Sequence, residues 1–210
     1  MTMARGWFIT LEGGEGAGKS TQLKAIGDWL SARGRQVVMT REPGGTPFGE
    51  QIRDVLLHER GHIDADTEVL LMFAARSAHI AKVIRPALAA GKTVVCDRFT
   101  DATYAYQGGG RGVAVDRIAK IEAWVQKELR PDLTILLDLP IELGNQRVRN
   151  RGAERDRFER EERAFFERVR AAYLAGAMRE PNRVHVVDAS RDVTEVTRAI
   201  AEILERVVHD

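Results

Sequence analysis

The sequence predicts an α/β fold in which a five-stranded parallel sheet is flanked by helices. Two observations carry this prediction. Short apolar segments alternate with segments of helical periodicity, and the polar motifs fall where the apolar segments end. Parallel strands that are buried on both faces read as continuous apolar runs, as these segments do. We therefore expect residues 1–210 to form a single domain that binds its ligands at the carboxyl ends of the strands.

The five apolar segments are the expected strands, at residues 6–12, 35–42, 92–99, 132–140 and 183–190. After the first of them, Leu23, Ile26 and Leu30 recur at helical spacing. Further helices are expected at residues 49–57, 66–89, 115–129, 141–151 and 193–207. Gly91 ends the longest of these helices, as glycine often does at a helix C-terminus.

Composition limits the classes of protein that fit. Hydrophobic residues make up 44% and charged residues 30%, which favours a packed core with a solvated surface. The net charge of +1 argues against a nucleic-acid partner bound through bulk charge. A single cysteine, Cys96, excludes an internal disulfide and a cysteine-based zinc site. We see neither a signal peptide nor an apolar run of the ~20 residues that span a membrane, so we expect a cytoplasmic protein.

A glycine-rich loop follows the first strand. The stretch "GGEGAGKS" matches the P-loop pattern GxxxxGK[ST], with the required strand before it and helix after it. Its backbone N–H groups and the helix N-terminus favour bound phosphate. Lys19 is expected to reach the β- and γ-phosphates, and the Ser20 hydroxyl to ligate Mg²⁺. The expected ATP-binding residues are Gly13, Gly14, Gly16, Ala17, Gly18, Lys19, Ser20 and Thr21.

The P-loop alone does not separate a kinase from a motor ATPase or a GTPase. The chain contains neither the N-K-x-D guanine reader nor the D-x-x-G turn of a GTPase. Asp97 and Arg98 follow the third strand, and Asp97 is expected to hold Mg²⁺ or its waters. Asp138, at the end of the fourth strand, is a competing candidate. We favour Asp97 because an arginine follows it directly.

Three further motifs have both a binding and a structural interpretation. The loop "TREPGGTPFGEQIR" either fixes arginines on a phosphate or is a stiff surface loop. Phe73 and Arg76 share a helix face and either form a base platform or belong to the core. In "TYAYQGGGRG", Tyr106 and Gln107 either face a sugar or base or lie in a connecting loop.

The run "RVRNRGAERDRFEREER" is dense in charges of both signs. It fits a solvated charged helix, because Glu159 and Arg163 have the i,i+4 order that supports one. The alternative is a lid whose arginines close over a triphosphate and which bends at Gly152.

Together these motifs resemble the thymidylate kinase family. The stretches that carry the resemblance are "EGGEGAGKST", "TREPGGT", "LLMFAAR", "DRFTDATYAYQGGGRG", "RPDLTILLDLP" and "RVRNRG" followed by "DRFE". The resemblance implies a P-loop nucleoside monophosphate kinase fold with a short lid at about residues 147–159. It also implies phosphoryl transfer from ATP·Mg²⁺ to dTMP, giving dTDP and ADP for dTTP biosynthesis. Members of the family usually form homodimers.

The resemblance assigns roles around the acceptor. Arg53 and Arg98 would bind the dTMP phosphate, with Arg98 also near the transferred group. Phe73 would stack on thymine and Arg76 would donate to thymine O4. Thr103 and Gln107 would lie along the base and sugar, Tyr106 would crowd the 2′ position, and Glu15 would accept a hydrogen bond from the 3′-hydroxyl.

Catalysis needs a cation on the transferred group besides Lys19 and Arg98. Some family members carry an arginine directly after the acid of the P-loop, where this chain has Gly16. The resemblance then implies a lid arginine, and the candidates are Arg149, Arg151 and Arg157. Two rival functions remain open at this point: a P-loop kinase for another nucleotide or nucleoside, and a nucleotide-binding switch that turns over slowly.

Overall fold

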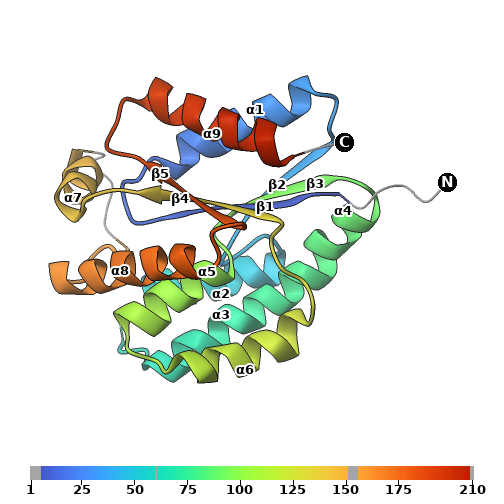
Figure 1. Ribbon diagram of the computed structural model, residues 1–210. Helices are drawn as coiled ribbons and strands as arrows, with labels where there is room; N and C mark the ends of the chain where they lie inside the picture. The colour runs from blue at the N-terminus through green and yellow to red at the C-terminus, as the bar shows by residue number, and fades with distance from the viewer. Residues whose placement is uncertain (1–5, 60, 151–155, 209–210) are drawn as a thin grey trace.

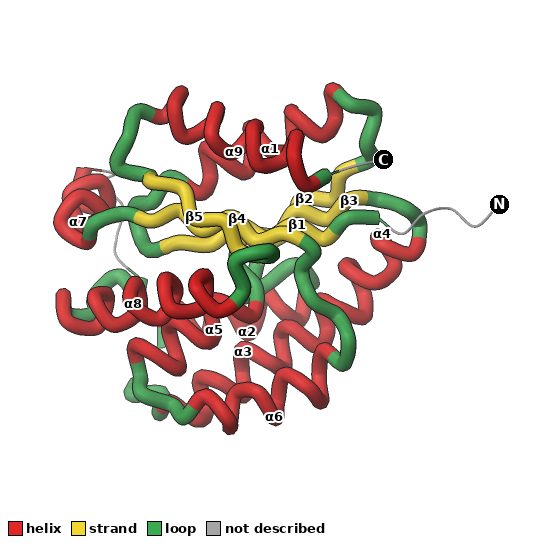
Figure 2. Tube along the Cα trace, viewed as in Figure 1, coloured by secondary structure: helices red, strands yellow, loops and turns green. Residues whose placement is uncertain are grey.

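The computed structural model describes residues 6–59, 61–150 and 156–208. A five-stranded sheet forms the middle layer, with α1 (Lys19–Ala32) and α9 (Val193–Val207) on one face and most other helices on the opposite face (Figures 1 and 2). The strands are β1 (Phe8–Gly13), β2 (Val37–Arg41), β3 (Thr93–Asp97), β4 (Leu133–Asp138) and β5 (Val184–Asp188).

The opposite layer contains α2 (Pro47–His58), α3 (Ala65–His79), α6 (Val115–Gln126) and α8 (Arg163–Arg179), and α3 continues into further helical segments. A π-helical turn η1 (Ile80–Ile84) joins α3 to α4 (Arg85–Ala89). After β3, α5 (Thr100–Thr103) continues into a second π-helical turn, η2 (Tyr104–Gly110). The helix α7 (Ile141–Asn150) lies at the edge of the sheet near the carboxyl ends of the strands (Figure 1).

All strand pairs are parallel, in the order β2-β3-β1-β4-β5. Leu11 of β1 lies beside Asp97 of β3 on one side and Ile135 of β4 on the other. Because all strands run the same way, the segments that follow β1, β2 and β3 meet at one edge of the sheet. The loop after β1 is therefore next to Asp97.

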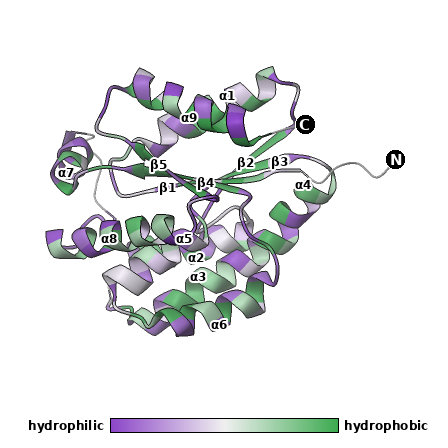
Figure 3. Cartoon of the chain, viewed as in Figure 1, coloured by the Kyte–Doolittle hydropathy of each residue, from purple (hydrophilic) through white to green (hydrophobic). Residues whose placement is uncertain are grey.

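The side chains of β1 alternate between the two layers, as the pleat requires. Ile9 and Leu11 belong to the core cluster formed with α1 and α9. In Figure 3, α9 alternates between hydrophobic and hydrophilic colours along its length, as expected of a helix with one buried face. Thr10 and Glu12 are equally buried but are polar, and the Thr10 hydroxyl lies 2.7 Å from that of Thr134.

The predicted strands and the parallel sheet are confirmed, and Gly91 follows the end of α4 as expected. Two helical segments were missed. Residues 100–110 are helical rather than a loop, and α8 occupies a part of the chain for which no helix was predicted. The charged run is not one helix either, because residues 157–161 form turns before α8 begins. Arg163 accordingly pairs with Glu142 and Glu167 instead of Glu159.

The signal for α8 is present in the sequence. Phe165, Val169, Tyr173 and Ala177 recur every four residues, and all of them are buried. A prediction based on the charged residues misses this apolar stripe, because arginines and glutamates lie between its members. Within the described ranges, no helix combines the length and the apolar character that crossing a membrane requires.

Candidate active site

A cavity of about 550 Å³, here called the front cavity, opens at the carboxyl ends of β1 and β3. The P-loop forms one wall, and segments after β2 and β3 form the others. Its lining residues are 15–20, 42–43, 53, 57, 72, 76, 97–99, 102–103, 106–107, 147–148, 156 and 158–159. The motifs that the sequence placed at strand ends therefore surround one space.

The P-loop contributes its second half to this cavity. Gly16, Ala17, Gly18, Lys19 and Ser20 line it, whereas the front cavity's lining does not include Gly13, Gly14 or Thr21. Gly13 and Gly14 begin the loop, and Thr21 is an exposed residue in the first turn of α1.

Gly16 is required for a steric reason. It has φ +72°, and a Cβ atom there would lie 2.5 Å from the carbonyl oxygen of Gly144 in α7. Conversely, a Cβ at Gly144 would lie 2.6 Å from the carbonyl oxygen of Glu15. The backbones of the P-loop and α7 are thus in direct contact at Gly16 and Gly144. No side chain, and so no arginine, fits at position 16 while α7 keeps this place.

Lys19 bends back over its own loop. Its Nζ atom donates to the carbonyl oxygens of Gly13, at 3.2 Å, and Gly14, at 3.1 Å. Burial, together with the nearby charge of Arg98, lowers the pKa of Lys19. An anion bound in the cavity would oppose both effects.

Asp97 and Ser20 line the front cavity together. One Asp97 oxygen, Oδ1, is buried and has no hydrogen-bond partner within the described part of the chain. An unpartnered carboxylate oxygen in a cavity that also contains a serine hydroxyl and an anion-binding loop fits a Mg²⁺ site. Phosphate and water would supply the remaining ligands of the ion. The described residues contain no group of three or more metal-ligating side chains, which Mg²⁺ bound to a nucleotide does not need.

The competing acid, Asp138, is engaged elsewhere. Arg170 of α8 donates to both of its oxygens, at 2.6 and 2.8 Å. Asp138 is also absent from the lining of the front cavity. Between the two candidates, the arrangement therefore favours Asp97.

Arg98 occupies the centre of the cavity wall. Its backbone is in the left-handed region, with φ +66°, which is uncommon for a residue other than glycine. Its guanidinium donates to Glu15 at 2.6 Å and to the Tyr173 hydroxyl at 3.3 Å, and it lies 4.7 Å from the centroid of the Tyr106 ring. The Tyr106 hydroxyl also donates to Glu15, at 2.9 Å. The carboxylate inside the P-loop is thus directed toward Arg98 and Tyr106.

A buried ion pair fixes Arg76 at the far end of the cavity. Glu42 accepts from Arg76 Nε at 2.7 Å and lies 2.9 Å from His79 Nδ1. Arg76 Nη2 donates to Thr103 at 3.0 Å, and Nη1 has no partner in the described residues although it is buried. The sequence had not indicated Glu42 or His79. The acidic residue of the "TREPGGT" motif was the available signal.

The structure does not place Phe73 in the front cavity, where it was expected to stack on a base. Its side chain is only 2% exposed and packs with Val69, Val113 and Ile118, outside the lining of the front cavity. Met72, which lies four residues before Arg76, lines the cavity instead. One residue on a helix turns the side chain by about 100°, so Met72 shares the cavity face with Arg76 and Phe73 does not.

The remaining predicted acceptor residues are brought together. Arg53, Thr103, Tyr106 and Gln107 all line the front cavity. Arg53 donates to the carbonyl oxygen of Pro43 at 3.0 Å.

Glu68, a buried residue of α3, gathers several donors at the same end. Gln107 donates to it at 2.7 Å, Arg157 donates at 2.6 Å, and Arg111 lies 3.4 Å away.

The three lid candidates differ in their placement. Arg149 is exposed at the end of α7, and Arg151 lies outside the described residues. Arg157 is held by Glu68 and by the carbonyl oxygen of Leu56, and it does not line the front cavity in this conformation. Arg147, which the sequence analysis had not selected, lines the cavity and donates to the carbonyl oxygens of Gly16 and Ala189.

The strand order, the P-loop after β1 and the arginine-rich acceptor side define a P-loop kinase of the nucleoside monophosphate class. The comparisons then identify the family. A family model described as "Thymidylate kinase" matches residues 11–200. The chain belongs to the thymidylate kinase family.

Similar proteins cover almost all of the chain. A thymidylate kinase of Chromohalobacter salexigens is 60% identical over 201 residues, 95% of each chain. One of Pseudomonas putida is 57% identical over 96% of this chain and 97% of its own. A crystal structure of thymidylate kinase from Ehrlichia chaffeensis superposes with a TM-score of 0.77 at 33% identity, covering 95% of this chain and 99% of that one.

Proposed function

We propose that this chain transfers the γ-phosphoryl group of ATP to dTMP, giving dTDP and ADP for dTTP biosynthesis. Membership of the thymidylate kinase family supports the reaction. One contact supports a donor side and an acceptor side in the front cavity: Arg98 donates to Glu15 at 2.6 Å. It joins the donor loop to the acceptor wall, so one short segment can hold two substrates in line.

The donor lies in the P-loop. Backbone N–H groups of residues 16–20 and the N-terminus of α1 bind the phosphates, and Lys19 turns from its own loop to the β- and γ-phosphates. Ser20 and Asp97 hold Mg²⁺, which when bound neutralises charge on the phosphates. The buried, unpartnered Oδ1 atom of Asp97 supports this role.

The acceptor lies on the other side of Glu15. Arg53 and Arg98 bind the dTMP phosphate, and Glu15 accepts a hydrogen bond from the 3′-hydroxyl. Tyr106, held against Arg98 and Glu15, crowds the 2′ position. These assignments follow from the shared cavity and from the contacts among its residues.

The base lies at the Arg76 end. Arg76 has one buried Nη1 donor with no partner in the described chain, which suits thymine O4. Thr103 and Gln107 line the cavity beside it. Met72 takes the place against the base that the sequence analysis had given to Phe73.

The catalytic arginine comes from the lid, at about residues 147–159. Steric exclusion of any side chain at Gly16 supports a source outside the P-loop. Arg149 and Arg151 remain candidates, and Arg147 joins them because it already reaches Gly16. Arg157 becomes a candidate only if lid movement breaks its ion pair with Glu68.

The chain forms a homodimer through the face built by α2, α3 and α6. Phe48 and Val55 on α2, Leu70 on α3 and Trp124 on α6 are all exposed, by 49%, 44%, 57% and 80%. Exposed large apolar side chains on α2, α3 and α6, with α3 packed against both of the others, favour a protein–protein contact. Leu70→Asp is expected to give monomers in analytical ultracentrifugation, and a wild-type protein that sediments as a monomer would contradict the proposal. A cytoplasmic location stays a prediction of the sequence.

The test is a coupled assay of ADP release with dTMP, dUMP, dCMP and AMP at saturating ATP·Mg²⁺. We expect kcat/KM for dTMP to exceed that for dCMP by at least ~10²-fold, because cytosine presents a donor to Arg76 where thymine presents an acceptor. Equal rates with all four acceptors would favour a kinase of another specificity. ADP release that no acceptor stimulates would favour the nucleotide-binding switch.

A further inference from the structure

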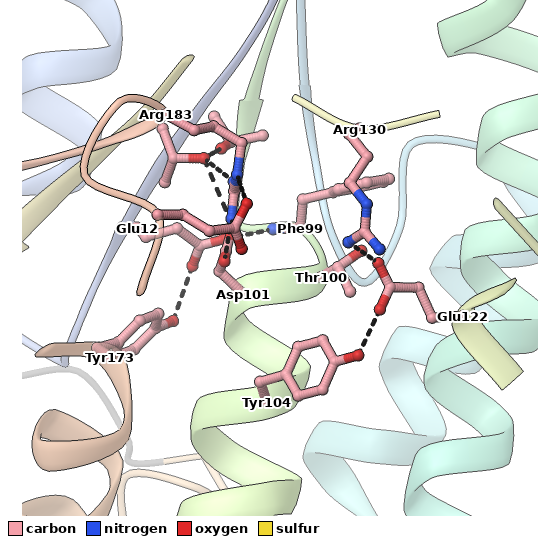
Figure 4. A network of polar contacts seen from close by, with 12 residues as sticks. Glu12, Phe99, Thr100, Asp101, Tyr104, Glu122, Arg130, Tyr173 and Arg183 are labelled. Carbon is pink, nitrogen blue, oxygen red and sulfur yellow. Dashed lines mark hydrogen bonds and ion pairs between the residues drawn. The ribbon is translucent and has the colours of Figure 1, made fainter. Parts of the chain in front are cut away.

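Figure 4 shows two tyrosine–glutamate pairs within one polar region of the molecule. Tyr173 of α8 donates to Glu12 Oε2 at 2.7 Å. Tyr104 of η2 donates to Glu122 of α6. Both pairs line or border a second cavity of about 370 Å³, here called the rear cavity, and no residue lines both the front and the rear cavities.

Only the first pair reaches the active site. The Tyr173 hydroxyl accepts from Arg98 Nη1 at 3.3 Å while it donates to Glu12. The other Glu12 oxygen accepts from the backbone N–H of Phe99 at 2.7 Å. Glu12 therefore holds Arg98 from two directions: through Tyr173 at the guanidinium, and through the next peptide at the backbone.

The backbone of Arg98 needs such support. A non-glycine residue in the left-handed region is strained and persists only where its surroundings hold it. The hydrogen bond from Phe99 N to Glu12 fixes the peptide that follows the strained residue. The hydrogen bond from Arg98 N to Leu11 O, at 3.0 Å, fixes its own amide.

The second pair, Tyr104 and Glu122, is a contact of the same kind that does not reach the active site. Glu122 accepts from Tyr104 and from Arg130, and both of these donors belong to the rear cavity. Within the described residues, neither Tyr104 nor Glu122 forms a hydrogen bond or ion pair with Arg98. The two pairs share chemistry and layer, and they differ in their connection to Arg98.

We propose that Tyr173 and Glu12 are positioning residues that set the backbone and guanidinium of Arg98 for phosphoryl transfer. The inference rests on the proposed role of Arg98 on the dTMP phosphate and the transferred group. Neither residue touches substrate, because neither lines the front cavity. Their effect on the reaction passes entirely through Arg98.

Glu12 makes this connection sensitive to pH. Burial, reinforced by Asp101, raises its pKa to about 8, against the opposing effects of Arg98 and of the bonds from Tyr173 and Phe99. The other charged or titratable groups around this network are Lys19 from α1, Cys96 from β3, Tyr106 from η2, Tyr173 from α8, Glu15 from the P-loop and Arg183 before β5.

Protonation changes what Glu12 can accept. As a carboxylate it accepts from both Phe99 N and the Tyr173 hydroxyl. When Oε2 carries a proton it donates to the Tyr173 oxygen instead, where Arg98 Nη1 already donates, and the tyrosine hydrogen loses its acceptor. The arrangement that holds Arg98 is therefore complete above pH about 8 and disturbed below it.

The experiment compares Tyr173→Phe with the matched control Tyr104→Phe in the full chain, with kcat and KM for ATP and dTMP measured from pH 6 to 10. Wild type should show kcat rising through an ionisation near pH 8. Tyr173→Phe should lower kcat above that pH by about tenfold, equivalent to ~1.4 kcal/mol, and should lose the ionisation while the KM for ATP stays unchanged. Tyr104→Phe should keep both the rate and the profile.

If Tyr173→Phe unfolds below the assay temperature, a second variant tests the positioning role. Glu12→Gln accepts from Phe99 N but cannot ionise, so it should show a low kcat with no ionisation near pH 8. Folded variants with the wild-type rate and pH profile would overturn the positioning role. A wild-type enzyme without dTMP-dependent ADP release would instead overturn the proposed function, so the two failures are distinguishable.

Discussion

The two faces of β1 differ in role: one belongs to the apolar core, and the other carries buried polar side chains. Ile9 and Leu11 face α1 and α9 inside a continuous apolar cluster. Thr10 and Glu12, the residues between and after them, face the other layer: Thr10 contacts the Thr134 hydroxyl, and Glu12 begins a polar network that ends at Arg98. One face stabilises the sheet, and the other holds a functional arginine. Burial is complete on both, so burial alone does not tell core from positioning residues.

The largest effect should come from the end of the polar network. Arg98→Ala is expected to lower kcat/KM for dTMP by ~10³-fold or more, because it removes a cation from the reacting phosphates and breaks the ion pair with Glu15. Steady-state kinetics measure this. Arg170→Ala is the control, since that arginine pairs with Asp138 away from the front cavity and should stay within about twofold of wild type. Comparable losses in both variants would contradict the assignment.

The apolar face should respond in stability and not in chemistry. Ile9→Ala is expected to lower the free energy of unfolding by about 3 kcal/mol, because Ile9 is fully buried and the variant leaves a cavity. Urea unfolding followed by circular dichroism gives the value. At a temperature where the variant is folded, kcat should be close to that of wild type. A large fall in kcat in the folded variant would show that the two faces are not separable.

On the polar face of β1, Glu12 should make the free energy of unfolding depend on pH. The pKa of Glu12 is raised from 4.5 to about 8, so folding favours its neutral form. Its contribution to stability is fully present below pH 4.5 and is lost as pH rises through about 8. Glu12→Gln stays neutral and should therefore gain stability relative to wild type between pH 5 and pH 9. Unfolding curves at the two pH values test the sign, and a difference that does not change with pH would contradict it.

The smallest effect should come from Thr10. Thr10→Val is nearly isosteric and removes the hydrogen bond to the Thr134 hydroxyl, while Arg183 still donates to Thr134 at 2.7 Å. The expected loss is about 1 kcal/mol of unfolding free energy, with no change in kcat. Thermal melting and the dTMP assay together measure it. A change in kcat here would extend the positioning network beyond Glu12.

Periodicity and motif spacing were sufficient to predict the sheet and the P-loop, and the resemblance to the family added several further residues that line the front cavity. They failed where two patterns overlap. The apolar stripe of α8, which carries Tyr173, lies within a segment rich in arginine and glutamate. Phe73 and Met72 are neighbours in sequence, and the phase of the helix decides which one faces the cavity. Glu42 was passed over because its partners, Arg76 and His79, come from a helix more than thirty residues later.

The sequence by itself determined the class of chemistry, because a glycine-rich loop between a strand and a helix can bind phosphate whatever surrounds it. It also predicted that the polar motifs meet at one edge of the sheet, since parallel strands deliver their ends there, while the acceptor roles came from the resemblance to the family. The tertiary structure decided how Arg98 is held. Glu12, Arg98 and Tyr173 come from β1, the segment after β3, and α8, and their contacts depend on packing between layers. The same packing, of α7 against the P-loop, decided that no side chain fits at position 16.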